Sequence, residues 1–382
     1  MSEAVICAVA RTPVGRYRGS LSKKSAVDLG ILAAKELMRR LGINPSSGIV
    51  DEVIFGQVLQ AGAGQAPARQ VALGAELPDT TPAITINKVC GSSLKAVMLA
   101  ANSIRAGEYE VIIAGGMESM TNAPYFGQKI SRTEFGEMQS TMIHDGLWDV
   151  YNDEHMGNTG ETVCSEFDIS REESDTFSVR SHSLSQAAWD NGWMDFEVFS
   201  LPELNHDEGI RSDTSIEALG EMKAAFTAEG RVTAGNSSQL SDGAAAVLVC
   251  SREKAEENGW PILASIMDYC TSGVAPARVM AAPIPAVNML LDRNGFTIDD
   301  IAFIEHNEAF AAASCAVAKA CGIPDEKFNP HGGAVAIGHP LGATGARCLM
   351  TLINALQRTG GGKGIVTLCL GGGNAVAMLV ES

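Results

Sequence analysis

One pattern occurs twice in this chain, as LGILAAKELMRRLGINPSSGIVDEVIF (29–55) and as VNMLLDRNGFTIDDIAF (287–303). Each stretch holds an apolar segment with helical character, a glycine, an acidic pair and a run of strand-forming residues. The glycines, Gly42 and Gly295, stand where a helix would end. Recurrence of the whole series in the same order indicates two copies of one structural unit.

Each copy then continues with a glycine-rich turn, a helix and a strand that ends in glycines. The first copy has the turn 90–93 and the strand 111–114, and the second has the turn 338–342 and the strand 365–370. Residues from about 117 to 241 therefore interrupt the first copy. A final strand also matches between the copies, at 242–249 and 373–380.

The helices and strands expected here indicate an α/β fold. Apolar residues repeat with helical spacing from Leu94 to Gly107 and again over 349–356. The strands are continuous Val/Ile/Leu runs without polar alternation, which is typical of a parallel sheet covered by helices on both faces. The predicted domains are a first half, an insertion and a second half, at 1–116 plus 242–261, at 117–241 and at 262–382.

Composition excludes several classes of partner. The formal charge is 28 − 45 = −17, without a Lys/Arg block, so a nucleic-acid surface or an anionic membrane is not expected. No apolar stretch has transmembrane length and no leader is seen, so we expect a cytoplasmic protein. The nine cysteines are scattered without a C-x-x-C pair, which predicts free thiols and no metal site.

Cys90 is a candidate nucleophile because it stands at a strand-to-helix turn, just before Gly91-Ser92-Ser93. The N-terminus of the following helix would stabilise a thiolate at that position. The alternative is a small buried hydrophobe, since free cysteine is among the most buried residue types. The turn position favours the nucleophile.

Two further side chains lie on glycine-rich turns. His339 sits in Gly-His-Pro, where the proline keeps it out of helical geometry, so it could act as a base or an oxyanion donor. Cys369 ends an apolar strand before three glycines, whose N–H groups could hold an anion. Taken alone, Cys369 would be core packing. For His331 we expect a turn histidine that is hydrogen-bonded to backbone.

Several motifs in one order resemble the thiolase family, the acyl-CoA C-acyltransferases, over essentially the whole chain. The resemblance implies a duplicated thiolase fold, with two βαβαβαββ halves packed as αβαβα layers and an inserted loop domain. The motifs are Arg11-Thr12-Pro13-Val14-Gly15, Cys90-Gly91-Ser92, Gly115-Gly116-Met117-Glu118-Ser119-Met120, His155-Met156-Gly157, Gly235-Asn236-Ser237-Ser238, Asn307-Glu308-Ala309-Phe310-Ala311, Gly338-His339-Pro340 and Cys369-Leu370-Gly371-Gly372-Gly373.

The same resemblance implies a role for each catalytic position. Cys90 would attack an acyl thioester with help from His339, and the acyl-cysteine would divide one carbon–carbon exchange into two transfers. Cys369 would be the second acid/base. The oxygen of the enolate would meet His339 and a water held by Asn307. Backbone N–H groups of Cys90 and Gly371 would hold the oxygen of the acyl-enzyme.

Coenzyme A is expected as a substrate, not as a bound cofactor, and the inserted segment 117–241 would cover it. No G-x-G-x-x-G turn suggests a nicotinamide or flavin site. Because the protein is acidic, local Arg/Lys residues or water must meet the CoA phosphates. By resemblance, the substrate and CoA positions are His155, Phe226, Ala234, Ser238 and Phe310. For Phe226, core packing is an equal alternative.

Three residues depart from the usual thiolase pattern. Ala375 stands where the family commonly has glycine, and its methyl group could crowd the backbone near the site. Gly160 stands where alanine is common, and His331 replaces an amide residue. His155 is typical of short-chain, acetoacetyl-CoA enzymes, although a broad or longer-chain degradative thiolase remains open. Sequence does not choose between synthesis and degradation.

Two other functions are weighed against a thiolase. A non-catalytic acyl-CoA-binding scaffold of the same fold is disfavoured because Cys90, Asn307, His339 and Cys369 are all present. A decarboxylating condensing enzyme, such as a ketoacyl synthase, typically has histidine where this chain has Asn307. The resemblance also implies a role in fatty acid metabolism and a homo-oligomer, a tetramer built as a dimer of dimers.

Overall fold

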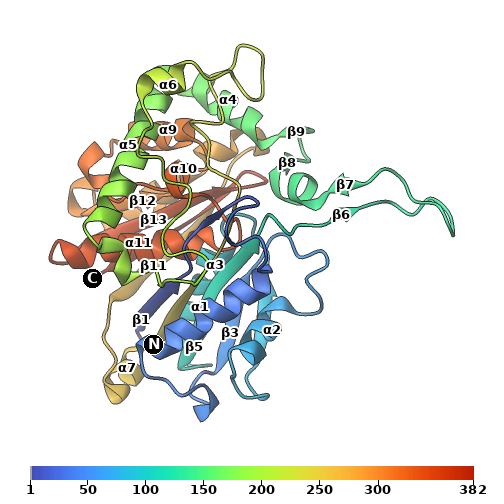
Figure 1. The fold of residues 1–382 in the computed structure, drawn as a ribbon. Helices are drawn as coiled ribbons and strands as arrows, with labels where there is room; N and C mark the ends of the chain where they lie inside the picture. Colours follow the sequence, from blue (N-terminus) through green and yellow to red (C-terminus); the bar gives the residue numbers. More distant parts are fainter. Residues whose placement is uncertain (1) are drawn as a thin grey trace.

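The computed structural model describes residues 2–382 and is organised around one ten-stranded mixed sheet (Figure 1). The strand order is β12-β13-β14-β11-β1-β10-β5-β3-β4, with the short β2 (Gly15–Arg16) paired to β10. The first half contributes β1 (Ala4–Arg11), β3 (Glu52–Gly56), β4 (Ala83–Ile86), β5 (Val111–Ser119) and β10 (Ser241–Ser251). The second contributes β11 (Ala264–Gly273), β12 (Phe303–His306), β13 (Lys363–Leu370) and β14 (Asn374–Glu381). The two half-sheets meet where β1 pairs with β11 over only two residues.

The prediction of a parallel sheet is wrong for most strand pairs. Pairs β3–β4, β3–β5 and β12–β13 are parallel, whereas β1–β10, β5–β10, β11–β14 and β13–β14 are antiparallel. The strands still read as unbroken apolar runs because both faces of each half-sheet are covered. An apolar strand composition shows that both faces of a strand are buried. It does not show whether the neighbouring strand runs parallel or antiparallel.

Helices form the outer and central layers, so the αβαβα arrangement is confirmed. Helices α3 (Ser92–Ala106) and α11 (Thr344–Arg358) lie side by side between the half-sheets (Figure 1). Helices α1 (Ala26–Arg40) and α2 (Pro67–Gly74) cover the first half-sheet, while α8 (Pro283–Asn294) and α9 (Ala311–Cys321) cover the second. Three separate apolar clusters fill the space between these layers.

The second copy differs from the first at one strand. In the first copy, β4 pairs with β3 over four residues. The corresponding segment of the second copy makes a single bridge, Ile304 to Phe328. The side chain of Asn329 continues the pairing instead, because its Oδ1 accepts from the N–H of His306 at 2.7 Å and its Nδ2 donates to the carbonyl of His306 at 2.9 Å. One amide side chain thus replaces part of a strand.

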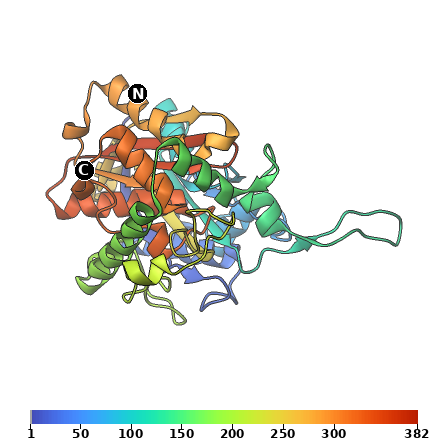
Figure 2. The same cartoon turned by 90° about the horizontal axis from the view of Figure 1, so that it is seen from above.

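The segment between β5 and β10 carries the remaining large features. A hairpin, β6 (Tyr125–Phe126) and β7 (Gln139–Ser140), projects far from the body in both views (Figures 1 and 2). Helices α4 (Met156–Glu166), α5 (Arg171–Asp190) and α6 (Ile216–Gly220) and the strands β8 (Trp148–Asp149) and β9 (Glu154–His155) follow. The short helices α7 (Arg252–Asn258) and α10 (Ala334–Ile337) belong to the two halves.

A buried ion-pair cluster ties this segment to the core. Arg11 on β1 donates to Glu197 at 2.7 Å and to Asp207 at 2.7 Å, and all three side chains are buried. Removing one member would leave an uncompensated charge in the interior, which commonly costs about 3–5 kcal/mol. The inserted segment is therefore anchored to β1 by buried ion pairs. The domain boundaries stay predictions.

Two searches of residues 2–382 are negative. No helix in this range combines the length and apolar character needed to cross a bilayer. Nor does the described part of the chain bring three or more His, Cys, Asp or Glu side chains together as a metal site.

Candidate active site

A small cavity of about 60 Å³ lies where the two halves and the inserted segment meet. It brings together seven positions singled out from the sequence: Cys90, His155, Ser238, Phe310, His339, Cys369 and Gly371. Asn307 reaches it through His339, whereas Phe226 and Ala234 do not line it. The other walls are mostly apolar and come from Val89, Gly146, Leu147, Met156, Val279, Met280, Ala309, Leu341 and Leu370.

Cys90 is presented by a strained turn just before α3. Val89 has φ 46°, a left-handed conformation that is unfavourable for a β-branched residue. The hydroxyl of Ser92 donates to the carbonyl of Val89 at 2.7 Å and accepts from the N–H of Lys88 at 2.8 Å, which braces the turn. Such local strain, of about 1–3 kcal/mol, persists only where the surroundings hold the backbone in place.

Burial of Cys90 opposes the thiolate that is expected from its position before a helix. Burial raises the pKa of the Cys90 thiol well above its usual range, and nearby Cys369 adds to the effect. The backbone N–H groups of Cys90 and Gly371 act in the opposite direction and lower this pKa, but they do not offset burial. Burial therefore favours a neutral thiol at Cys90.

His339 is held between two polar side chains. Its Nδ1 lies 2.6 Å from the hydroxyl of Thr344, and its Nε2 lies 3.3 Å from Nδ2 of Asn307. Burial lowers the pKa of His339 to about 3, so the imidazole is neutral near pH 7. The preceding residue, Gly338, has φ +106° and lies directly against Ser241. Only glycine fits there, because a Cβ would meet Oγ of Ser241 at 2.1 Å.

Cys369 lies near the end of β13 with its sulfur 3.7 Å from Sδ of Met280. Burial raises the pKa of this thiol to about 12. Ala375, the residue opposite it on β14, is fully buried in the core cluster that contains Cys270 and Ala282. Its methyl group therefore packs into the core on the same face of the sheet as Cys369, and the crowding expected at this position stays a prediction.

Aromatic rings stack behind the cavity wall. His155 lies nearly parallel to Phe226 with ring centroids 4.8 Å apart, and Phe226 meets Phe310 edge-on at 6.2 Å. Nδ1 of His155 accepts a hydrogen bond from the N–H of Gly157 at 3.0 Å. The ring hydrogen of the neutral imidazole is therefore on Nε2. Phe226 thus supports His155 from behind, while Ala234 lies exposed on the loop before Ser238.

Sequence reasoning missed two buried groups beside the site. Glu118 accepts backbone N–H bonds from Val58 at 3.0 Å, Leu59 at 3.2 Å and Gly342 at 3.0 Å. Burial raises the pKa of Glu118 to about 7, and these three bonds act in the opposite direction. An acidic residue inside an apolar strand was the available signal. The other is Thr344, for which the sequence held no signal beyond its position five residues after His339.

His331 lies outside the cavity, in a turn as predicted. Its ring packs against Trp193 at 5.2 Å, and its carbonyl accepts from the hydroxyl of Ser185. The expected ring-to-backbone hydrogen bond is wrong, since Nδ1 is buried without a partner among the described residues. Burial, with a smaller effect from Arg358, lowers the pKa of His331 to about 4.

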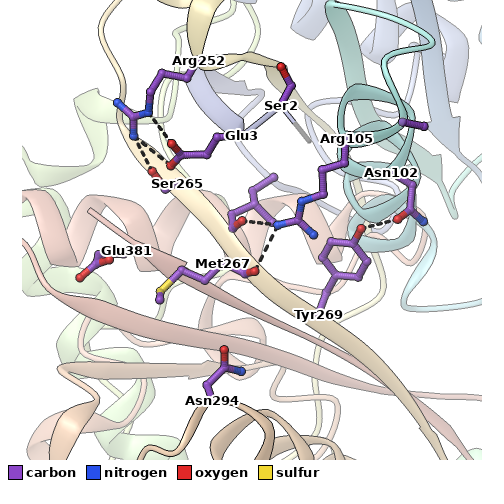
Figure 3. Close-up of a pocket in the computed structure, with 12 residues that line it drawn as sticks. Ser2, Glu3, Asn102, Arg105, Arg252, Ser265, Met267, Tyr269, Asn294 and Glu381 are labelled. Carbon is purple, nitrogen blue, oxygen red and sulfur yellow. Dashed lines mark hydrogen bonds and ion pairs between the residues drawn. The ribbon is translucent and has the colours of Figure 1, made fainter.

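A larger surface pocket of about 880 Å³ lies elsewhere, beside the C-terminal end of α3 (Figure 3). Its two arginines already have partners. Arg252 binds Glu3 at 2.5 Å, and Arg105 donates to the carbonyl groups of Ile266 and Met267. Neither cysteine nor histidine is among the described residues that line this pocket, so the chemistry predicted from the sequence belongs to the smaller cavity.

Comparison with known proteins agrees with this geometry. The family models of the thiolase N-terminal and C-terminal domains match residues 4–253 and 260–382. This chain belongs to the thiolase family. An acetyl-CoA acetyltransferase of Cupriavidus necator is 46% identical over 393 residues, covering all of both chains. One of Pseudomonas aeruginosa is 45% identical over 390 residues, covering 99% of each. The crystal structure of Acat5 thiolase from Ascaris suum in complex with coenzyme A matches with TM-score 0.94 and 34% identity over all of both chains.

Proposed function

We propose that this thiolase is an acetyl-CoA C-acetyltransferase, which cleaves acetoacetyl-CoA with coenzyme A and, in reverse, condenses two molecules of acetyl-CoA. One observation carries the proposal: two thiols, Cys90 and Cys369, and the imidazole of His339 face one cavity of about 60 Å³. The acetyltransferase relatives, similar along their whole length, favour this activity over a scaffold.

In the first transfer, the sulfur of Cys90 attacks the 3-keto carbon of acetoacetyl-CoA. Because both groups rest neutral, the thiol proton passes to His339 as the sulfur–carbon bond forms. The backbone N–H groups of Cys90 and Gly371 lower the pKa of the Cys90 thiol, so they are near enough to the sulfur to bind the oxygen that becomes negative. Donors of this kind commonly lower a barrier by about 3 kcal/mol each.

The carbon–carbon bond then breaks, and Cys369 supplies the proton that the leaving acetyl-CoA enolate takes up at carbon. His339, which now carries the proton of Cys90 on Nε2, and a water held by Asn307 would bind the enolate oxygen. Oδ1 of Asn307 is buried without a hydrogen-bond partner within residues 2–382. In the second transfer, coenzyme A gives its thiol proton to the resulting Cys369 thiolate and attacks the acetyl group on Cys90. The sulfur of Cys90 leaves that group and takes its proton back from His339. The products are two acetyl-CoA, and both cysteines return as thiols.

Short acyl groups fit the cavity best. Leu147, Met156 and Met280 close its apolar wall, and His155 stands among them. Ser238 and Phe310 would contact the pantetheine arm from the cavity, with Ala234 on the exposed loop beside it and Phe226 behind. Coenzyme A is a substrate in this scheme, and no resident cofactor or metal takes part.

The protruding hairpin supports a homo-oligomer. Four large apolar side chains on it are more than half exposed: Tyr125, Ile130, Phe135 and Met138. Several exposed large apolar side chains on one projecting segment favour a role for it in a protein–protein interface. A tetramer built as a dimer of dimers is proposed, in the cytoplasm and in the metabolism of fatty acids, without nucleic-acid or membrane partners.

The test is CoA-dependent loss of acetoacetyl-CoA by the purified protein, with 3-ketooctanoyl-CoA in parallel. We expect turnover of the short substrate, abolished in Cys90→Ala and in Cys369→Ala. Cys321→Ala, a cysteine distant from the cavity, is the matched control and should leave turnover unchanged. Trapping with acetyl-CoA should acetylate Cys369→Ala but not Cys90→Ala. Turnover of both substrates would indicate a broad degradative enzyme, and turnover of neither would favour the scaffold.

A further inference from the structure

Thr344 holds a hydroxyl group between two partners at the base of the active-site loop. It is the first residue of α11 and is fully buried. Its Oγ1 lies 2.6 Å from Nδ1 of His339 and 2.9 Å from the carbonyl oxygen of Pro340. No other hydrogen bond to Nδ1 of His339 is found within residues 2–382.

Counting hydrogens decides how these contacts are made. A carbonyl oxygen only accepts, so the contact with Pro340 needs the hydroxyl proton. The contact with Nδ1 then needs a proton on the ring nitrogen. If the hydroxyl donated to Nδ1 instead, two oxygen acceptors would face each other at 2.9 Å without a hydrogen between them. Only one arrangement therefore makes both short contacts hydrogen bonds.

We propose that Thr344 is a positioning residue, which fixes His339 as the tautomer protonated at Nδ1 and leaves Nε2 unprotonated. At rest the lone pair of Nε2 accepts from Nδ2 of Asn307 at 3.3 Å, and it gives up this long contact when it takes the proton of Cys90. The inference rests on the proposed function, in which His339 accepts the proton of Cys90. An imidazole protonated at Nε2 could not take that proton.

The opposite side of the ring agrees with this assignment. Nδ2 of Asn307, an N–H donor, lies 3.3 Å from Nε2 of His339, and a donor there requires an unprotonated Nε2. The choice of tautomer matters because the ring is neutral. A doubly protonated imidazole would have no lone pair at either nitrogen. Thr344 and Asn307 thus impose the same protonation pattern from the two ends of the ring.

The test compares two substitutions at one position. Thr344→Val keeps the branched shape and removes the hydroxyl, whereas Thr344→Ser keeps the hydroxyl. We expect Thr344→Val to lower kcat about 10- to 100-fold with KM changed less than about twofold, because general base catalysis is impaired while binding is not. Thr344→Ser should stay within about threefold of the parent protein. Equal losses in both variants would mean that packing alone matters and would overturn the proposal.

A spectroscopic measurement on the resting protein separates this inference from the proposed function. With ¹⁵N-labelled histidine, the Nε2 signal is recognised by its coupling to the Hδ2 proton, and His339→Asn identifies the His339 signals by difference. We expect a protonated Nδ1 and an unprotonated Nε2 in the parent protein, a pattern lost in Thr344→Val. A protonated Nε2 in the parent protein would overturn the proposal, even if Thr344→Val does not fold. Absence of thiolase turnover with the expected tautomer would contradict the proposed function instead.

Discussion

The carboxylate of Glu118 accepts a hydrogen bond from the backbone N–H of Gly342 at 3.0 Å, across 224 residues of chain and between the two halves of the fold. The same carboxylate also accepts hydrogen bonds from the backbone N–H groups of Val58 and Leu59. A Cβ on Gly342 would meet the carbonyl oxygen of Met117 at 2.5 Å, so the loop that follows His339 is wedged against β5. Glu118 therefore ties that loop to β5 and to the segment that follows β3.

Glu118→Gln should weaken both stability and catalysis. Glutamine offers one oxygen to three donors, and its amide hydrogens would face a backbone N–H. We expect a loss of about 1–3 kcal/mol in the free energy of unfolding at pH 8, with a lower kcat. Chemical denaturation and steady-state kinetics measure both. Glu326→Gln, on an exposed glutamate, is the control. Unchanged values for Glu118→Gln would show that the carboxylate does not brace the loop.

The reactivity of Cys90 should rise with pH without levelling near neutrality. Burial raises the pKa of the Cys90 thiol and lowers the pKa of His339 to about 3, so the free protein holds a thiol and a neutral imidazole. Below its pKa, the thiolate fraction grows about tenfold per pH unit. Alkylation by iodoacetamide, followed at Cys90 by peptide mass spectrometry from pH 6 to 9, should show this slope. A plateau near pH 7 would reveal a thiolate–imidazolium pair at rest.

His331 should make the protein sensitive to acid. Its folded pKa is lowered to about 4 from an ordinary value of 6.5, so the unfolded chain binds a proton that the folded protein excludes. The stability contributed by neutral His331 is complete above about pH 6.5 and is lost as the pH falls toward 4.

By this linkage, His331→Asn should reduce the loss of unfolding free energy between pH 7 and pH 5 by about 2 kcal/mol. Urea unfolding at the two pH values gives the comparison. His144→Asn, at an exposed histidine, serves as the control. The same acid sensitivity in His331→Asn and in the parent protein would contradict the assigned pKa.

Gly157→Ala should disturb the aromatic support of His155. A Cβ at Gly157 would stand 2.3 Å from three carbons of the Phe226 ring, which must then move away from His155. We expect a loss of about 1–3 kcal/mol in stability and a higher KM for acetoacetyl-CoA. Gly160→Ala is the matched control on the same helix, because its Cβ would lie 3.0 Å from Val232. Since alanine favours a helix by about 1 kcal/mol over glycine, that change should be close to neutral.

Local sequence was sufficient for the elements and for most of the predicted positions that the structure brings into one cavity. Gly107 and Gly295 end their helices at φ +71° and +67°, as a helix stop requires. Cys90 and His339 reach one cavity because each lies on a turn next to a central-layer helix. Phe226 was harder to assign, since it supports His155 from behind and does not face the cavity.

The sequence by itself determined the duplication, the α/β class and which side chains stand on glycine-rich turns, because these depend on neighbouring residues and on repeated order. Only the tertiary structure decided strand direction, the replacement of a strand by the Asn329 side chain, and the burial of Cys90. Each depends on what another part of the chain brings close, and burial raises the pKa of the Cys90 thiol. Contacts such as Glu118 to Gly342 leave no periodic trace in the sequence, since a single side chain makes them across 224 residues.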